Sequence, residues 1–148
     1  MQPTRLHAIV AVHLFLVRGD ELLLLRRLNT GYEDGNYSVI AGHLDGGEPV
    51  LVAMMREARE EAGIDLDPNT TAIAGVMHRL TAFDERVDFF VVATDWTGEI
   101  VNREPEKCDE LRWFPLDELP SNLIPYIRTA INAWQSGAWF TSHGFDVG

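Results

Sequence analysis

The chain has 148 residues, of which 46% are hydrophobic and 24% are charged, as expected for a single globular domain with one substantial core. Its 23 acidic and 12 basic residues give a formal net charge of −11, which disfavours non-specific binding to duplex nucleic acid or anionic lipid, because both need a cationic face. The single cysteine, Cys108, excludes an intrachain disulfide and a cysteine-based zinc site, and no apolar run approaches the roughly 20 residues that cross a bilayer, so we expect a cytoplasmic protein without a membrane span.

The first third of the chain is expected to form strands and loops. Ala8–Val17 is apolar and rich in β-branched residues, and a short polar turn separates it from Leu22–Leu25, which predicts a hairpin. Asn29–Asn36 contains residues that favour turns and is predicted to be a loop. Tyr37–Ala41 is predicted to form a short strand, and Gly42–Gly47 is predicted to form a second, glycine-rich loop.

The rest of the chain is predicted to hold two helices and three strands. Pro49–Ala62 consists of good helix formers, with proline where its missing N–H costs least and Gly63 just beyond the end. A second helix is predicted over Leu123–Gln135 from apolar residues at helical spacing. The strands are predicted over Thr71–Leu80, Arg86–Thr94 and Leu111–Phe114. This order of elements predicts an α/β fold, with a mixed β-sheet sandwiched between helices, in one domain over residues 1–148.

The helix over Pro49–Ala62 carries three glutamates on one face. At about 100° per residue, Glu60 lies about 60° to one side of Glu57, and Glu61 lies about 40° to the other side. The apolar residues predicted to pack on the sheet occupy a separate arc, and they are Leu51, Met54, Met55, Ala58 and Ala62. One face of this helix therefore builds the core while another carries negative charge.

Glutamates three and four residues apart on a helix repel one another, at a cost of a few tenths of a kcal/mol per pair in an exposed helix. Arg56 lies one turn before Glu60 and can offset part of this repulsion. A hard divalent cation such as Mg²⁺ or Mn²⁺ would offset more, because it takes oxygen ligands from carboxylates, water and phosphate. Taken alone, the three glutamates fit a solvated acidic face better than a metal site, because most charge runs are solvated.

The preceding loop changes this interpretation. It contains Gly42, Gly46 and Gly47, which let the backbone turn closely around a bound group, and Glu48 stands at the helix start, where the helix dipole favours negative charge. The whole segment, 42–64, resembles the Nudix box of the MutT-like hydrolases. The fixed positions of that box are occupied by Gly42, Glu48, Arg56, Glu57, Glu60, Glu61, Gly63 and Ile64.

Two positions depart from the usual form of the box. Ala58 is smaller than the bulky apolar residue usually found there, and Ile40-Ala41-Gly42 replaces the Pro-Gly-Gly that often enters the box. Many fixed positions at fixed spacing nevertheless make the match far more specific than a lone glycine motif. The resemblance implies the Nudix α/β/α sandwich and the metal-dependent hydrolysis of a nucleoside diphosphate linked to another group.

The resemblance also implies roles for residues of the box. Glu57, Glu60 and Glu61 are predicted to ligate Mg²⁺ or Mn²⁺, together with the backbone carbonyl of Ala41, and Glu60 or Glu61 is a candidate to deprotonate the attacking water. Arg56 is predicted to orient a glutamate of the helix, and its alternative is a surface ion pair of little energetic value.

Three further assignments complete the predicted site. Glu48 is predicted to be a supporting carboxylate near the metal. Gly42, Gly46 and Gly47 are predicted to form the phosphate- and metal-binding loop. Some relatives take their general base from outside the box, and the region 104–110 offers Glu104, Glu106, Asp109 and Glu110, among which the sequence does not choose.

The sequence predicts little about substrate recognition. The candidates for stacking on a base are Tyr32, Tyr37, Phe83 and Trp96, but an aromatic residue in or beside a strand more often packs in the core. We expect a nucleotide or nucleoside diphosphate derivative as the partner, without duplex nucleic acid or membrane, and leave a homodimer open. The choice between Mg²⁺ and Mn²⁺ and the phosphorus attacked are also undetermined.

Two alternatives to a Nudix hydrolase of small nucleotides remain. A non-catalytic Nudix-fold binding or regulatory module would typically lack carboxylates of the box, whereas this chain keeps all of them. An RNA-decapping enzyme is disfavoured by the acidic charge and by the lack of an evident basic stripe.

Overall fold

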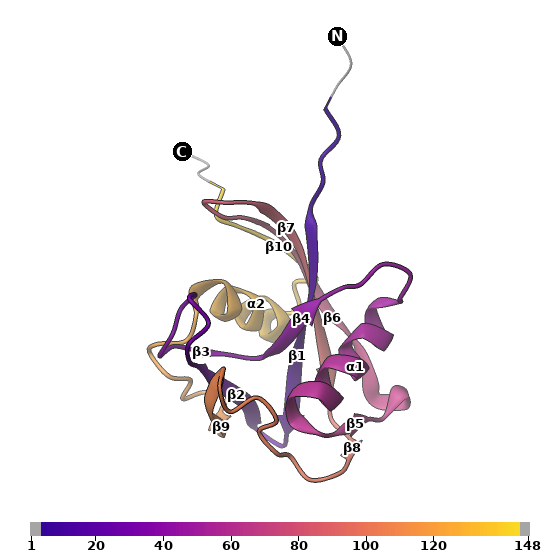
Figure 1. Ribbon diagram of the computed structural model, residues 1–148, viewed down its shortest axis with the longest axis vertical. Helices are drawn as coiled ribbons and strands as arrows, with labels where there is room; N and C mark the ends of the chain where they lie inside the picture. The colour runs from indigo at the N-terminus through magenta and orange to yellow at the C-terminus, as the bar shows by residue number, and fades with distance from the viewer. Residues whose placement is uncertain (1–3, 146–148) are drawn as a thin grey trace.

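The computed structural model describes residues 4–145 and places an eight-stranded mixed sheet between two α-helices (Figure 1). The helices are α1 (Val50–Ala62) and α2 (Pro125–Ser136). The strands of this sheet are β1 (Ile9–Arg18), β2 (Glu21–Arg27), β3 (Tyr37–Ser38), β4 (Ile40–His43), β6 (Thr71–Leu80), β7 (Glu85–Ala93), β9 (Cys108–Pro115) and β10 (Phe140–His143). The α/β fold predicted from the sequence is thereby confirmed.

The sheet is built around β1. Its strand order is β10-β6-β7-β1-β2-β3, with β4 paired to β1 and β9 paired to β2. The β1–β7 and β6–β10 pairs are parallel, and the other pairs are antiparallel. Because β4 pairs with β1 through residues 40–43, the loop that enters α1 starts at the centre of the molecule.

Helix α1 begins and ends close to the predicted residues. Pro49 is the N-cap residue, one position before the first helical residue, and Gly63 ends the helix in the left-handed conformation with φ of 69°. The N–H of Gly63 donates to the carbonyl of Arg59, which is the helix termination that glycine favours. The capping fixes where the acidic face of α1 lies relative to the end of β4.

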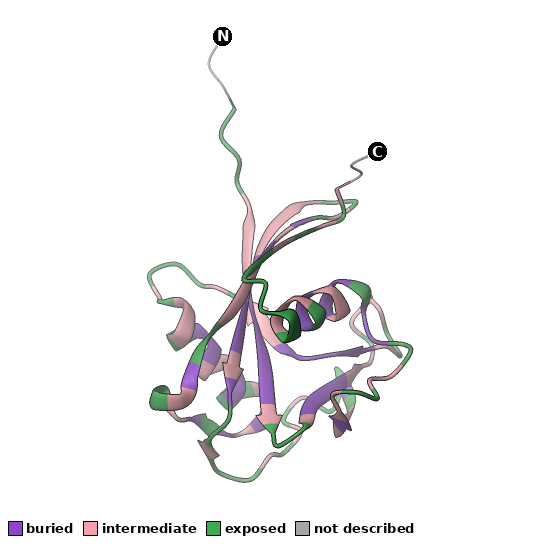
Figure 2. Cartoon of the chain, turned by 180° about the vertical axis from the view of Figure 1, so that it is seen from behind, coloured by how far each residue is buried: buried purple, intermediate pink, exposed green. Residues whose placement is uncertain are grey.

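Two hydrophobic cores lie on opposite faces of the sheet, one under each helix. Helix α1 buries Ala53, Met54, Ala58 and Ala62, with Leu51 and Met55 packed at the margin of the same core. Helix α2 covers the other core with Tyr126, Ile127, Ala130 and Ile131. Figure 2 shows the buried residues following the central strands and the inner sides of both helices.

Several elements differ from the prediction. The predicted strand 37–41 is two short strands, β3 and β4, because the chain changes its pairing from β2 to β1 at Val39. β9 begins at Cys108 rather than Leu111, because its start pairs with β2. Three features were not predicted from the sequence, namely β10, the small β5–β8 ribbon (Asp65–Leu66 and Trp96–Thr97) and the 3₁₀ turn at Pro68–Thr70.

Within residues 4–145, none of the helices combines the length and the apolar character needed to span a bilayer.

Candidate active site

The glycine that opens the box, Gly42, lies directly against the helix glutamate Glu57. A Cβ atom on Gly42 would collide with the carboxylate of Glu57. Gly42 pairs with Val12 of β1, so the backbone at this position has little freedom to move away. The absence of a side chain at residue 42 therefore sets the position of the Glu57 carboxylate.

Replacing Gly42 by alanine is expected to displace Glu57 and to lower kcat/KM for the hydrolysis proposed below by about tenfold to a hundredfold, as when a group that orients a metal ligand is lost. Steady-state kinetics measure the effect, with circular dichroism as a check of folding. Gly137→Ala is the control, because nothing lies within 4 Å of a Cβ atom added at Gly137 and this residue caps α2 outside the lining of the carboxylate cavity. Equal activity in both variants would contradict the inferred contact.

Arg56 gathers the carboxylates of the loop and of the helix. Its Nη2 lies 2.8 Å from Glu48 and its Nη1 lies 2.9 Å from Glu57, with Glu60 farther away at 3.4 Å. These charge-assisted hydrogen bonds offset the repulsion expected on this face of α1. The hydrogen bonds from Arg56 also lower the pKa of Glu48. Arg56 thus ties the start of α1 to its middle turns and fixes the Glu57 side chain.

Glu61 has a different environment. Burial raises its pKa to about 9, and the charges of Glu57 and Glu104 add to the rise. The backbone N–H of Ala41 donates to Glu61 Oε2 at 3.2 Å. No Lys, Arg or His among residues 4–145 forms an ion pair with Glu61. This side chain is therefore a shielded carboxylate without a neutralising cation.

Glu57 and Glu61 line one cavity of about 380 Å³, together with Glu104 and Gly42. Burial also raises the pKa of Glu57, although Arg56 opposes the rise. The cavity therefore concentrates hard oxygen donors whose negative charge is only partly compensated. A bound cation would stabilise the ionised forms of these carboxylates.

The donor set fits one divalent ion that is only partly held by protein. Within residues 4–145, no three His, Cys, Asp or Glu side chains form a ready-made metal site. Mg²⁺ does not need one, because it is commonly held by one or two carboxylates plus water and substrate phosphate. Glu57 and Glu61 can supply those carboxylates. The Ala41 carbonyl stays a predicted ligand, since the contact that Ala41 makes with Glu61 is through its N–H.

The other predicted site residues lie farther from this cavity. Glu60 has a side chain that is 54% exposed and contacts Arg56. Gly46 and Gly47 lie in an exposed part of the loop, beside Glu48 rather than beside Glu61. The structure thus brings together Gly42, Glu57 and Glu61, joins Glu48 through Arg56, and leaves the Gly46-Gly47 pair at the rim.

The four acidic candidates outside the box are separated by their contacts. Glu104 lines the cavity with Glu57 and Glu61. Asp109 accepts two hydrogen bonds from Arg26, at 2.9 and 3.0 Å, and Glu110 accepts one from Tyr37. Glu106 is exposed. Only Glu104 of these four faces the carboxylates of α1.

A second cavity of about 640 Å³ adjoins the first and shares Arg27, Ala41, Gly42 and His43 with it. Its further lining includes Tyr32, Phe83 and Tyr126. Of the four aromatic candidates, Tyr32 and Phe83 thus lie beside this cavity. Tyr37 is buried in the core under α2, and Trp96 stacks on Trp113 with ring centroids 5.9 Å apart.

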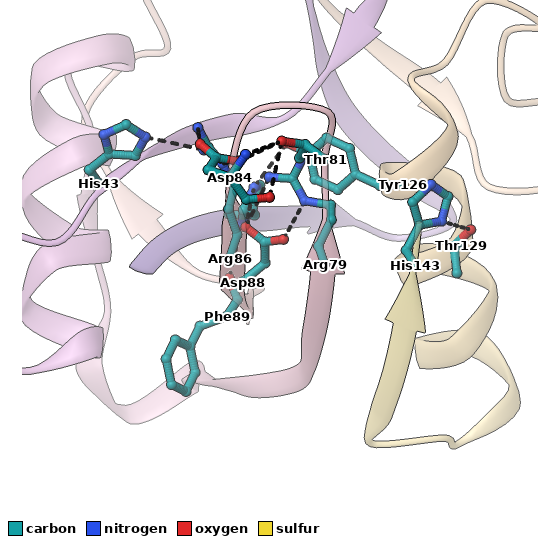
Figure 3. Close-up of polar contacts among 11 residues, drawn as sticks. His43, Arg79, Thr81, Asp84, Arg86, Asp88, Phe89, Tyr126, Thr129 and His143 are labelled. Atoms are coloured by element: carbon teal, nitrogen blue, oxygen red, sulfur yellow. Dashed lines mark hydrogen bonds and ion pairs between the residues drawn. The ribbon is translucent and has the colours of Figure 1, made fainter. Parts of the chain in front are cut away.

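A buried polar network forms the floor of this second cavity. This network was not predicted from the sequence. His13, Arg79, Asp88 and Tyr126 have residue exposures between 0% and 8%. Arg79 donates to both carboxylate oxygens of Asp88, at 2.6 and 3.2 Å, and its guanidinium lies 3.7 Å from the centroid of the Tyr126 ring (Figure 3). The signal in the sequence was a polar residue at an inward position of each apolar strand, His13 in β1 and Asp88 in β7.

His13 is held neutral in this network. Its Nδ1–H donates to the Phe89 carbonyl at 3.3 Å, and its Nε2 accepts from the Tyr126 hydroxyl at 3.1 Å. Burial lowers the pKa of His13 from 6.5 to about 4, although the nearby Asp88 carboxylate opposes the change. The unfolded chain therefore takes up a proton near pH 6.5 that the folded chain takes up only near pH 4.

Acidification from pH 7 to pH 4 is expected to remove about 3 kcal/mol of stability through His13 alone, because protons bind the unfolded state first. Urea unfolding at several pH values measures the loss, and His13→Gln removes this contribution. Between pH 6.5 and pH 4, the free energy of unfolding should fall more steeply with decreasing pH in the wild type than in this variant. Equal slopes in that window would show that His13 does not titrate as described.

The geometry of the carboxylate cavity agrees with the comparison to known proteins. The model of the NUDIX domain family matches residues 7–135. The chain belongs to this family. Membership confirms the resemblance read from the box at 42–64, and it extends the match across both helices and most strands of this Nudix chain.

Relatives and solved structures support the same placement. The NAD-capped RNA hydrolase NudC of Stutzerimonas stutzeri (strain A1501) is 36% identical over 106 residues, which are 72% of this chain and 36% of that protein. The 8-oxo-dGDP phosphatase NUDT18 of Homo sapiens is 28% identical over 120 residues, with 77% of this chain and 34% of that protein covered. The Nudix chain thus spans about a third of the length of these curated relatives.

The crystal structure of the MutT NUDIX hydrolase from Burkholderia pseudomallei has a TM-score of 0.79 and 30% sequence identity to the Nudix chain. The match covers 85% of this chain and 97% of that chain. The mixed sheet and the two flanking helices are therefore an arrangement that this chain shares with an experimentally determined Nudix structure.

Proposed function

We propose that this Nudix chain is a metal-dependent pyrophosphohydrolase that cleaves a diphosphate bond in a nucleoside di- or triphosphate or a nucleoside diphosphate derivative. The observation that carries the proposal is the shielded carboxylate pair, Glu57 and Glu61, in one cavity. Among residues 4–145, the ion pair of Arg56 with Glu57 is the only ion pair that either carboxylate makes. A protein of net charge −11 repels a polyphosphate unless cations lie between them.

Each residue has a role that follows from its contacts. Glu57 and Glu61 would hold the divalent ion, and Glu60, at the exposed edge of the helix, would add a further carboxylate. Arg56 positions Glu57, and Glu48 anchors Arg56 through its 2.8 Å contact. When bound, Mg²⁺ or Mn²⁺ neutralises phosphate charge and lowers the pKa of a coordinated water.

Proton removal from the attacking water needs a carboxylate inside the cavity. Glu104 meets this condition, and it lies outside the set of carboxylates held by Arg56. A base must lie within hydrogen-bond reach of the water that it deprotonates. We therefore place Glu104 first among the acidic candidates of region 104–110, with Glu61 as the alternative if Glu104→Gln keeps its activity.

Small nucleotides are favoured over RNA as substrates. The relative from Stutzerimonas stutzeri bears a name that refers to NAD-capped RNA, and an NAD moiety contains the diphosphate that the proposed chemistry requires. The net charge of −11 opposes binding of an RNA backbone. We expect free NAD or another small nucleoside diphosphate derivative to be turned over more efficiently than NAD-capped RNA.

A substrate panel tests the proposed function. Nucleoside triphosphates, nucleoside diphosphate sugars, NAD and NAD-capped RNA are incubated with Mg²⁺, with Mn²⁺ or with EDTA, and the products are separated by chromatography. Turnover with either metal and none with EDTA is expected, and ¹⁸O-water identifies the phosphorus that is attacked. Tight binding of a nucleotide without any product would favour a non-catalytic binding module instead.

A further inference from the structure

Strand β10 forms one edge of the large sheet. It is the last strand in the order β10-β6-β7-β1-β2-β3, and among residues 4–145 it pairs only with β6 (Figure 1). The N–H of Val76 donates to the carbonyl of Trp139 at 2.9 Å, so the backbone groups of Trp139 and, by alternation, of Thr141 face β6. The N–H and C=O groups of Phe140 and Ser142 therefore face away from the sheet, where a further strand can pair with them.

Large apolar side chains lie beside this free edge. Trp139 is 74% exposed and Phe140 is 46% exposed, and their ring centroids lie 5.5 Å apart. Ile73 of the neighbouring strand β6 is 45% exposed. The sequence of β10, Phe-Thr-Ser-His, contains none of the prolines, lysines or acidic residues that commonly block an edge. Exposed apolar surface beside an unblocked edge indicates a site of association with another chain.

The start of β10 is fixed to the rest of the chain. Gly137 ends α2 in the left-handed conformation with φ of 82°, and the N–H of Ala138 donates to the carbonyl of Ala133 at 2.8 Å. A Cβ atom on Gly75 would lie 3.3 Å from the carbonyl oxygen of Trp139, so a glycine at this position lets β10 approach β6 closely. A preformed edge loses little conformational entropy when it pairs with a partner.

This region also differs in charge from the rest of the chain. No Asp, Glu, Lys or Arg occurs from Thr129 to Phe145, the longest such stretch of the sequence. The neighbouring charged groups are paired within the chain, because His78 lies 2.6 Å from Glu85 and Arg79 binds Asp88. Two copies of a chain with net charge −11 repel each other. The uncharged stretch is therefore where two copies can approach with the least repulsion.

Two β10 strands are complementary to each other when they run antiparallel. A twofold axis at Thr141 places Phe140 of each copy opposite Ser142 of the other, and these are the residues whose N–H and C=O groups face outward. Each such pair exchanges two hydrogen bonds, which satisfies the outward groups of both residues. The same axis brings Trp139 of each copy opposite His143 of the other, within reach of a cross-strand contact. A second copy thus fits this edge by symmetry.

We propose that the chain forms a reversible homodimer in which two β10 strands pair antiparallel and join the two sheets into one. Trp139 and Phe140 supply the apolar contact, and the outward backbone of Phe140 and Ser142 supplies the hydrogen bonds. A strand of four residues makes a small interface, so we expect association in the micromolar range rather than an obligate dimer. No residue of β10 lines the carboxylate cavity, so the dimer does not depend on the proposed function.

Sedimentation velocity of the full chain tests the dimer, over protein concentrations from about 1 µM to about 1 mM. The wild type should shift from monomer to dimer as the concentration rises. Ser142→Pro removes an outward N–H that the monomer does not use, and it should weaken dimerisation at least about tenfold, because two hydrogen bonds are lost per dimer. Ser142→Ala is the matched control and should dimerise like the wild type, because it keeps the N–H. Circular dichroism checks that both variants fold.

Further measurements identify the interface independently of proline. Trp139→Ala should weaken the dimer about tenfold, as when an aromatic residue at the centre of an interface is lost. Val52→Ala removes a half-exposed apolar side chain from α1 and should leave the dimer unchanged. Added NaCl should strengthen association, because salt screens the repulsion between copies of like charge. Amide hydrogen exchange at residues 140 and 142 should slow as the protein concentration rises.

Three results would overturn the proposal. The first is a monomer at every concentration. The second is a dimer that Ser142→Pro and Trp139→Ala leave unchanged, because its interface would lie elsewhere. The third is a dimer that Ser142→Pro and Ser142→Ala weaken equally, because the side chain of Ser142 rather than backbone pairing would then hold it. If Ser142→Pro does not fold, Trp139→Ala and the hydrogen exchange at residues 140 and 142 decide the question.

Discussion

Replacing Glu61 by glutamine is expected to lower kcat for metal-dependent hydrolysis about a thousandfold, within the range for loss of an essential metal ligand or general base. Glutamine keeps the shape of the side chain and an oxygen acceptor for the Ala41 N–H, but it cannot carry the charge that attracts a divalent ion. The measurement is the initial rate at saturating Mg²⁺ or Mn²⁺ with the best substrate of the panel.

Two further variants distinguish a role in the cavity from a general loss of negative charge. Glu99 is exposed and lies outside the carboxylate cavity, so Glu99→Gln should keep full activity. Glu60→Gln should lose less activity than Glu61→Gln, because the Glu60 side chain is 54% exposed and is not part of the cavity lining. Full activity in both Glu60→Gln and Glu61→Gln would show that the ligand assignment is wrong.

Glu61→Gln, which is expected to lower activity, is not expected to lower the stability of the metal-free protein. The pKa of Glu61 is raised to about 9 in the folded chain, so the folded state holds a proton at pH 7 that the unfolded state has lost. Stability contributed by this proton therefore falls as pH rises above the unfolded value. Glu61→Gln removes that loss, and its unfolding midpoint in EDTA should equal or exceed that of the wild type. Low activity with undiminished stability would identify a functional carboxylate.

The central elements of the fold were predictable because their signals are local. Three elements combine apolar periodicity with a turn or capping residue at the end: Ile9–Arg18, Val50–Ala62 and Thr71–Leu80. The start of β9 and all of β10 were not predictable in this way. Each depends on pairing with a strand far along the chain, β2 for β9 and β6 for β10, and local sequence carries no information about such partners.

The candidate site likewise has residues that the sequence predicts and residues that only the tertiary structure identifies. Gly42 and Glu57 follow from the spacing of the box, because a helix and its preceding loop fix their relative positions. The selection of Glu104 from the acidic loop required the cavity, since it depends on how the chain after β8 folds back beside α1. The positions of Phe83 and Tyr32 beside one cavity also came from tertiary structure. Spacing thus predicts the carboxylates, and only packing predicts what surrounds them.

The buried ion pair between Arg79 and Asp88 should give the largest effect on stability. Asp88 is 0% exposed and Arg79 is 5% exposed, so Asp88→Leu leaves a guanidinium in the interior without its counter-ion. The expected loss is about 3–5 kcal/mol in the free energy of unfolding, the usual cost of breaking a buried pair by removing one partner. Urea unfolding at pH 7 measures it. As a control, Glu21→Gln breaks the exposed pair with Arg18 and should change stability by no more than about 1 kcal/mol.

A double-mutant cycle shows whether this cost comes from the unpaired charge. Arg79→Met removes the guanidinium, so Asp88→Leu combined with Arg79→Met should be more stable than Asp88→Leu alone. Additive losses would mean that packing around residue 88, rather than the ion pair, carries the stability.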